Sequence, residues 1–291
     1  MGKMFLALLL TVIVLPGLAG PELLTGPDDP ACWGGKVRRV QEAERGKGPC
    51  FELYGKYPTP LVWRPLIPVD PAKTYVLKVS FRSVSAELPA SAYLGVELYD
   101  AQKRLIAIRN MWTKAGSESE VVSARAGDDF LTVKMIPDHA KFKACVVAFG
   151  AMKDGSDLPN FDLSARIAAM KPGENGNLRI ELKKPLAKSY PAGTPVRLHA
   201  YYPHSMYDLA AGWVPAGPGI DHTVRLYSEG YTPGGTGGKT RKFWKGTKYF
   251  RPFVWFGNWN RKPKPGAKLL IDGWSVTEIP SAEKGSEGNV P

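Results

Sequence analysis

Residues 74–82 alternate apolar and polar side chains with a period of two, and this pattern constrains the fold most strongly. The apolar positions are Tyr75, Leu77, Val79 and Phe81. Such a period places the two sets on opposite faces of a β-strand. Ala92–Tyr99 repeats the pattern, and Asp100–Lys103 forms a hairpin turn into a further strand, Arg104–Met111. We therefore predict an antiparallel sheet with a polar outer face.

Turn-forming residues are abundant throughout the chain. Its 291 residues include 26 prolines and 31 glycines, spread along the whole length. This distribution favours many short strands joined by turns over long helices. The length suits one large domain or two small ones.

The N-terminus has the three parts of a secretory signal peptide. Lys3 supplies the positive charge, Met4–Leu15 is an apolar run, and Pro16–Gly20 offers small residues for cleavage. The apolar run is too short for a stable membrane span, and no later stretch is apolar enough for one. We expect residues 1–20 to be removed and the mature protein to be secreted, into a periplasmic or extracellular space.

The three cysteines are Cys32, Cys50 and Cys145, and their spacing fits no zinc motif. An oxidising compartment allows a disulfide between Cys32 and Cys50, which would close an N-terminal loop. Cys145 would then stay free and buried. Three reduced thiols are the equal alternative.

A basic and aromatic stretch, Lys239–Trp274, stands out near the C-terminus. No acidic residue occurs between Gly230 and Ile271, and the whole chain has a formal net charge of +12. Aromatic faces stack on sugar rings or bases, while Lys and Arg attract anions, so this mixture suits an anionic polymer such as an acidic polysaccharide. The alternative is that the aromatics mostly build core strands.

Three segments carry a resemblance to a known family: Pro68–Leu77 (PVDPAKTYVL), Leu94–Asp100 (LGVELYD) and Leu269–Thr277 (LLIDGWSVT). They resemble the jelly-roll, galactose-binding-like carbohydrate-binding modules that bind cellulose, xylan and β-glucans. The resemblance covers residues 22–115 and 203–279. It implies an all-β jelly-roll β-sandwich with a non-catalytic, polysaccharide-binding function. It also implies a structural Ca²⁺ at Asp272, with no other cofactor required.

The region between the two matching parts looks like an insertion. Its opening (GDDF) and its ending (PLAKSYPAGTPV, Pro185–Val196) are similar to a small β-module of exported proteins. We expect a signal peptide at 1–20, the sandwich at 21–118 and 201–279, the insert at 119–200, and a disordered tail at 280–291.

The strand Tyr249–Phe256 carries large aromatic side chains on both faces, so its outer face either lies under the insert or binds a ligand. In the binding alternative Trp255 or Tyr249 stacks on a sugar, and Arg251 holds a carboxylate or sulfate. The candidate carbohydrate-binding residues are Tyr93, Tyr99, Trp112, Tyr249, Arg251, Trp255, Trp259, Arg261 and Lys262.

Catalytic signatures are sparse, and we assign no catalytic residue. The chain has no G-x-S-x-G, no H-E-x-x-H and no P-loop. One alternative is a polysaccharide lyase using Tyr202, His204 and Arg251, or a glycoside hydrolase, which needs two carboxylates. Glu97 and Asp100 lie on one hairpin, but nothing in the sequence marks them as a catalytic pair, and solvated surface carboxylates are the favoured interpretation. Another is a structural cell-surface or matrix protein. We expect a glycan partner, no specific nucleic acid and no membrane span, and leave the oligomeric state open.

Overall fold

The computed structural model describes residues 21–35, 37–41, 49–54, 59–84, 87, 90–204, 206–214, 220–227, 242–257 and 265–280. The predicted signal peptide and nearly all of the predicted tail lie outside these residues. Trp259, Arg261 and Lys262 also lie outside them.

One sheet has seven strands, all paired antiparallel. Its main path runs β1 (Trp33–Gly34), β4 (Thr59–Trp63), β17 (Tyr249–Phe256), β7 (Ala90–Tyr99) and β15 (Met206–Val214), with β5 (Ile67–Pro68) beside β17 and β8 (Leu105–Ile106) beside β7. The strands β7 and β17 are therefore central. The strand β15 follows closely after His204.

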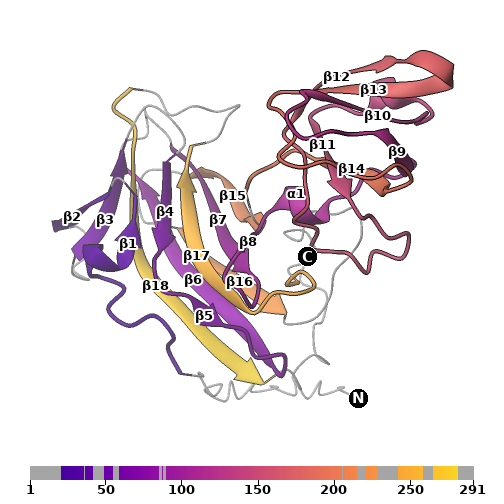
Figure 1. The fold of residues 1–291 in the computed structure, drawn as a ribbon. Coiled ribbons are helices and arrows are strands. Elements are labelled where there is room, and N and C mark those ends of the chain that lie inside the picture. Colours follow the sequence, from indigo (N-terminus) through magenta and orange to yellow (C-terminus); the bar gives the residue numbers. More distant parts are fainter. Residues whose placement is uncertain are drawn as a thin grey trace, which may run out of the picture.

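The second sheet has five antiparallel strands. In order, these are β16 (Ile220–Tyr227), β6 (Lys73–Ser83), β18 (Lys268–Pro280), β3 (Pro49–Tyr54) and β2 (Val37–Gln41). Both sheets contribute to one core, in which Leu77 and Phe81 of β6 pack with Leu94 of β7 and Val254 of β17. The predicted all-β sandwich is confirmed, and Figure 1 shows its two layers. The jelly-roll topology stays an expectation.

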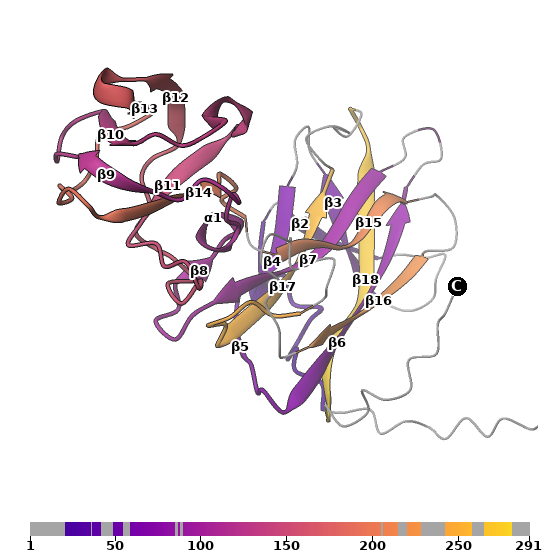
Figure 2. The ribbon, with the colours of Figure 1, turned by 90° about the vertical axis from the view of Figure 1, so that its right-hand side faces the viewer.

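The inserted segment forms a separate six-stranded sheet with its own core. The strand order is β11 (Cys145–Phe149), β14 (Pro195–Ala200), β9 (Ser119–Ser123), β10 (Phe130–Lys134), β13 (Asn177–Leu182) and β12 (Ile167–Pro172). The buried cluster runs from Val121 to Leu198, inside the range expected for the insert. In Figure 2 this module stands on the side of the sandwich that carries β4, β7 and β17, with β8 and α1 between.

The helix α1 (Ile108–Met111) joins the sandwich to the insert. The predicted strand over Arg104–Met111 is wrong there, because side-chain bonds close a single helical turn. Asn110 Oδ1 accepts a hydrogen bond from the Ala107 backbone N–H at 2.8 Å, and Asn110 Nδ2 donates to the Asn160 carbonyl at 2.9 Å. The other helices are short 3₁₀ turns at Pro30–Cys32, His139–Lys141 and Glu174–Gly176. None of the helices that the structure describes is long and apolar enough to cross a membrane.

A buried polar network fastens the insert to this helix. Arg197 donates through Nη2 to Asp157 at 2.9 Å and through Nε to His199 Nε2 at 3.2 Å. The other ring nitrogen of His199 lies 2.8 Å from the Arg109 carbonyl. Burial lowers the pKa of His199 to about 4, and the nearby Arg197 charge adds to the effect. The imidazole is therefore neutral at pH 7, as its place between a guanidinium and a carbonyl requires.

The proposed disulfide is absent, since Cys32 and Cys50 are not bonded to each other. Cys32 packs against the core between the sheets. Cys50 alternates along β3 with Phe51 and Leu53, which both point into that core, so its side chain is on the outer face. The two thiols thus lie on different sides of the sheet that carries β3. Cys145 is buried as expected.

Candidate functional site

The register of β7 and β17 gathers five of the predicted binding residues on the outer face of the seven-stranded sheet. The directly opposed pairs are Trp255 with Tyr93, Phe253 with Gly95, Arg251 with Glu97, and Tyr249 with Tyr99. The alternate residues of β17, including Val254, are in the core. We call the outward set, Tyr93, Glu97, Tyr99, Tyr249, Arg251, Phe253 and Trp255, the aromatic face.

The centre of the aromatic face is a bonded trio of side chains. Arg251 Nε donates to Glu97 Oε2 at 2.6 Å, and the Tyr99 hydroxyl donates to the same oxygen at 2.6 Å. The Arg251 guanidinium carbon also lies 5.1 Å from the centre of the Tyr99 ring. Glu97 was not among the predicted binding residues. It is the residue that fixes Arg251 in place.

The trio has a consistent protonation state. Burial raises the pKa of Tyr99 above its ordinary value, and the hydrogen bond to Glu97 and the charge of that carboxylate raise it further. The phenol therefore remains a donor across the physiological range. Because the Arg251 charge faces Glu97 at bonding distance, it is largely neutralised within the trio.

The aromatic face is partly covered. Phe253 is only 3% exposed and Tyr99 is buried, whereas Tyr93, Tyr249 and Trp255 are intermediate. His204 contributes to the cover, with its ring edge-on to Trp255 at 4.6 Å between centres. The aromatic face thus has a covered centre and partly exposed aromatic side chains at its ends, and its cover by the insert and its binding of a ligand both stay predictions.

Residues 202–204 extend this surface towards the insert, and the backbone of α1 holds them in place. The Ile108 N–H donates to the His204 carbonyl at 2.8 Å, and the Arg109 N–H donates to the Tyr202 carbonyl at 3.1 Å. Tyr202, 42% exposed, stacks on Trp112 with 6.3 Å between ring centres and an interplanar angle of 23°. The predicted residue Trp112 therefore belongs to a neighbouring aromatic pair rather than to the sheet face itself.

The residues proposed for catalysis are engaged in other ways. Asp100 is buried and holds its own turn, where Oδ1 accepts from the backbone N–H groups of Gln102 and Arg104. It is therefore not poised as a partner for Glu97 in hydrolysis. Of the lyase set, Tyr202 stacks on Trp112 and Arg251 is bound to Glu97. Burial lowers the pKa of His204, so its ring is neutral at pH 7.

Asp272, where the resemblance implies a structural calcium, lies at a bulge in β18 and is followed by Gly273 with φ of +61°. The calcium stays an expectation. The N-terminal segment does bridge the last strand, but at Thr277, opposite Glu22. Asp29 accepts from the Ala31 N–H at 2.9 Å in its own turn. In the part of the chain described, no group of three or more His, Cys, Asp and Glu side chains could hold a metal ion.

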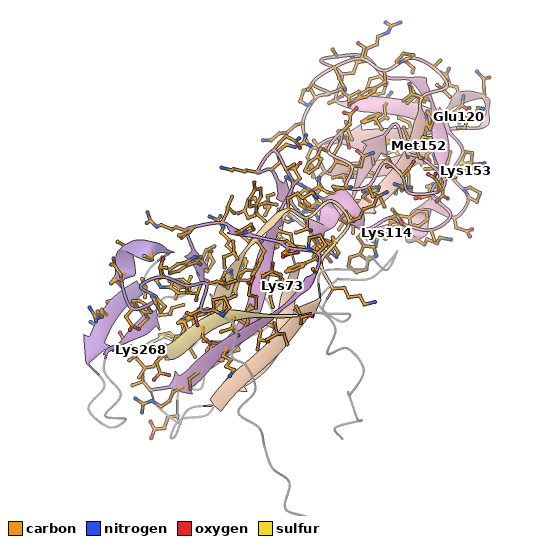
Figure 3. All side chains as sticks on the ribbon, turned by 90° about the horizontal axis from the view of Figure 1, so that it is seen from below. Lys73, Lys114, Glu120, Met152, Lys153 and Lys268 are labelled. Carbon is orange, nitrogen blue, oxygen red and sulfur yellow. The ribbon has the colours of Figure 1, made fainter. Side chains whose placement is uncertain are left out.

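The insert contains an open hollow of about 740 Å³. Glu120, Met152 and Lys153 line it, and Figure 3 shows them together in the module. Three of its six charged lining residues form ion pairs, since Glu120 contacts Lys134 Nζ at 2.5 Å and the buried Arg197 is bound to Asp157. The hollow also has two exposed methionines in its lining, Met135 and Met152.

Comparison of the chain with protein-family models, with curated proteins and with solved structures finds no match. The resemblance to carbohydrate-binding modules therefore rests on the quoted sequence motifs and stays an expectation.

Proposed function

We propose that this protein is a non-catalytic carbohydrate-binding protein that holds polysaccharide on the aromatic face. The observation that carries the proposal is the cross-strand alignment of Trp255 with Tyr93 and of Tyr249 with Tyr99. The partly exposed rings of Tyr93 and Trp255 at one end, and of Tyr249 at the other, offer apolar surfaces for the C–H faces of sugar rings. The trio between them supplies fixed polar groups for hydroxyls.

A neutral polysaccharide suits this face better than an anionic one. The Arg251 charge is paired with Glu97 through Nε, so a ligand carboxylate or sulfate that binds the other guanidinium N–H groups would meet the negative charge of Glu97 beside it. Sugar hydroxyls can donate to Glu97 and accept from Arg251 without breaking the pair. The predicted role of Arg251 as an anion clamp is therefore replaced by one in which it orders Glu97.

Secretion belongs to the same proposal. The signal-like N-terminus, residues 1–20, supports export, and polysaccharides of the kind that the resemblance implies occur outside the cell. The absence of a disulfide between Cys32 and Cys50 is compatible with either compartment.

The test is binding of the mature protein to cellohexaose, xylohexaose and laminarihexaose by calorimetry, at low and high salt. We expect one or more of them to bind with little dependence on salt, because neutral sugars release no counterions. Trp255→Ala should weaken binding at this face by about tenfold, the equivalent of one stacking contact.

Phe130→Ala is the matched control. Phe130 is also a partly exposed aromatic, with the Arg179 guanidinium 3.4 Å from its ring centre, but it lies in the insert. Unchanged binding in Trp255→Ala and Tyr93→Ala would refute the assignment. Release of unsaturated uronates from alginate or glycosaminoglycans would favour the lyase alternative instead.

A further inference from the structure

The five-stranded sheet carries a second copy of the side-chain trio found on the aromatic face. Glu97-Leu98-Tyr99 on β7 has the same sequence as Glu52-Leu53-Tyr54 on β3. In both copies an arginine lies directly opposite the glutamate on the next strand, Arg251 in the first and Arg38 in the second. The leucine of each copy is fully buried in the core, which turns the glutamate and tyrosine outward.

The second copy borders a groove. Arg38 Nη2 lies 2.7 Å from Glu52 Oε1, and Lys268 Nζ lies 3.3 Å from Glu52 Oε2. The side chain of Glu52 is only 7% exposed, so two cations hold it in a fixed orientation. Tyr54 is 43% exposed, and Gly266 completes the wall from the turn before β18. The hollow between these residues has a volume of about 350 Å³.

These groups have the chemistry that saccharides require. The exposed Tyr54 ring provides a flat apolar surface, and the Arg38 guanidinium carbon lies 6.0 Å from its centre. The donors of Arg38 and Lys268 that do not face Glu52 can bind hydroxyl oxygens, and Glu52 can accept from hydroxyl hydrogens. The volume is at the small end of the range for ligand sites.

We propose that this groove, formed by Arg38, Glu52, Tyr54 and Lys268, is a second saccharide-binding site, which makes the protein bivalent. The class of ligand rests on the function proposed for the aromatic face. The two sites lie on the outer faces of opposite sheets. Figure 3 places Lys268 at the end of the sandwich far from the insert, whereas Lys114, beside Trp112, lies at the junction with it.

Bivalency has a specific consequence because of this placement. Two sites on one face could bind one chain and add avidity, but sites on opposite sheets engage different chains. The protein would therefore cross-link soluble polysaccharide. A one-site protein of the same affinity would bind polysaccharide without bridging it.

The test combines stoichiometry with bridging. Whichever of cellohexaose, xylohexaose and laminarihexaose binds the native protein is titrated into native protein, Tyr54→Ala, Tyr54→Phe and Trp255→Ala, with Phe130→Ala as control. We expect two sites in the native protein and in Tyr54→Phe, which keeps the ring. We expect one site of native affinity in Tyr54→Ala and one in Trp255→Ala, with the altered site weaker by about tenfold.

Bridging is measured by light scattering of the corresponding soluble polysaccharide, after sedimentation shows that the protein is monomeric. The native protein should raise the scattering, and Tyr54→Ala should abolish the rise while still binding the oligosaccharide. A stoichiometry that Tyr54→Ala leaves unchanged, or no binding of any of the three oligosaccharides, would overturn the second site. Full binding in Trp255→Ala together with complete loss in Tyr54→Ala would refute the aromatic face alone and leave the groove as the binding site.

Discussion

The two Glu-Leu-Tyr segments have the same sequence and the same cross-strand arginine, but their surroundings differ. On β7 the tyrosine is 8% exposed and its hydroxyl donates to Glu97. On β3 the tyrosine is 43% exposed, and Lys268 rather than the phenol is the second partner of the glutamate. The tyrosine ring of the first trio is therefore covered, whereas the ring of the second trio is accessible to a ligand.

The position of each strand in its sheet explains this difference. β7 is central, paired with β17 and β15 and also with β8, so neighbouring side chains surround the Tyr99 ring. β3 lies one strand from the edge, between β18 and the terminal strand β2. A short sequence motif thus sets which side chains face outward, whereas its place in the sheet decides whether they are accessible.

The largest predicted loss of stability comes from truncating the leucine of either segment, and it should be the same in both, because both leucines are 0% exposed in one core. Leu98→Ala and Leu53→Ala should each lower the free energy of unfolding by about 2–5 kcal/mol. Urea unfolding followed by tryptophan fluorescence measures this loss. Val84→Ala, at a 48% exposed position, is the control and should change stability by less than about 0.5 kcal/mol. A loss confined to Leu98 would mean that β3 is not part of the shared core.

Acid should weaken the trio on the aromatic face more than the trio on β3. The aromatic face contacts His204, in the segment that α1 and the insert hold in place. The pKa of His199 falls from 6.5 to about 4 on folding, so the unfolded chain binds more protons between these values. The stability from neutral His199 is complete above about pH 6.5 and is lost as the pH falls towards about 4, by about 3 kcal/mol in all. The pKa of Asp157 is also lowered. Burial opposes this, but hydrogen bonds from Asn160 and the charge of Arg197 outweigh it, so its contribution is lost at still lower pH.

The measurement is unfolding stability at about pH 7 and about pH 4.5. His199→Gln should be less stable at neutral pH but should lose less on acidification, whereas the control His139→Gln should follow the native protein. In the same window, binding at the aromatic face should weaken before binding at the Tyr54 groove. Equal pH dependence in His199→Gln and native protein would contradict the role of this histidine.

The local sequence predicted which residues share a face but not what they touch. The period of two put Tyr249 and Trp255 on one face of their strand and turned Tyr93 outward on another strand, since alternation along a strand is a local property. That these residues share one outer face follows from the pairing of β7 with β17. The bond between Glu97 and Arg251 depends on the register of strands about 150 positions apart, which no local pattern encodes. The repeat of Glu-Leu-Tyr in the sequence could have indicated the second trio, but no local pattern indicated that Tyr54 is exposed.

The wrong predictions have the same origin. A disulfide between Cys32 and Cys50 was suggested by proximity in the sequence, yet the alternation of β3 turns Cys50 away from the core that Cys32 contacts. The strand expected over residues 104–111 is found only at Leu105–Ile106, and Ile108–Met111 forms a helical turn because Asn110 bonds to Asn160 of the insert. Tertiary contacts override local preference at both places.

A smaller effect distinguishes the two tyrosines. Tyr99→Phe removes a 2.6 Å hydrogen bond to Glu97 inside a half-buried trio, and we expect a loss of about 1 kcal/mol in unfolding free energy. Tyr54→Phe removes a hydroxyl from a side chain that is 43% exposed, so its effect should lie within about 0.5 kcal/mol. Combining each change with Glu97→Gln or Glu52→Gln gives a double-mutant cycle. Coupling between Tyr54 and Glu52 as strong as that between Tyr99 and Glu97 would mean that the Tyr54 hydroxyl also bonds to its glutamate.

The smallest expected effect concerns the two arginines. Arg38 is 56% exposed, and Lys268 continues to pair with Glu52 when the guanidinium is removed, so Arg38→Gln should change the unfolding free energy by no more than about 0.5 kcal/mol. Arg251 is 29% exposed and is the only cation within ion-pair distance of Glu97 among the described residues, so Arg251→Gln should cost about 1 kcal/mol. Raising the salt concentration should reduce the stability loss of Arg38→Gln more than that of Arg251→Gln, because the more exposed ion pair is screened more strongly. A loss of unfolding free energy in Arg38→Gln equal to that in Arg251→Gln would show that Lys268 does not share the charge of Glu52. The trio on β3 would then depend on its arginine as much as the trio on β7.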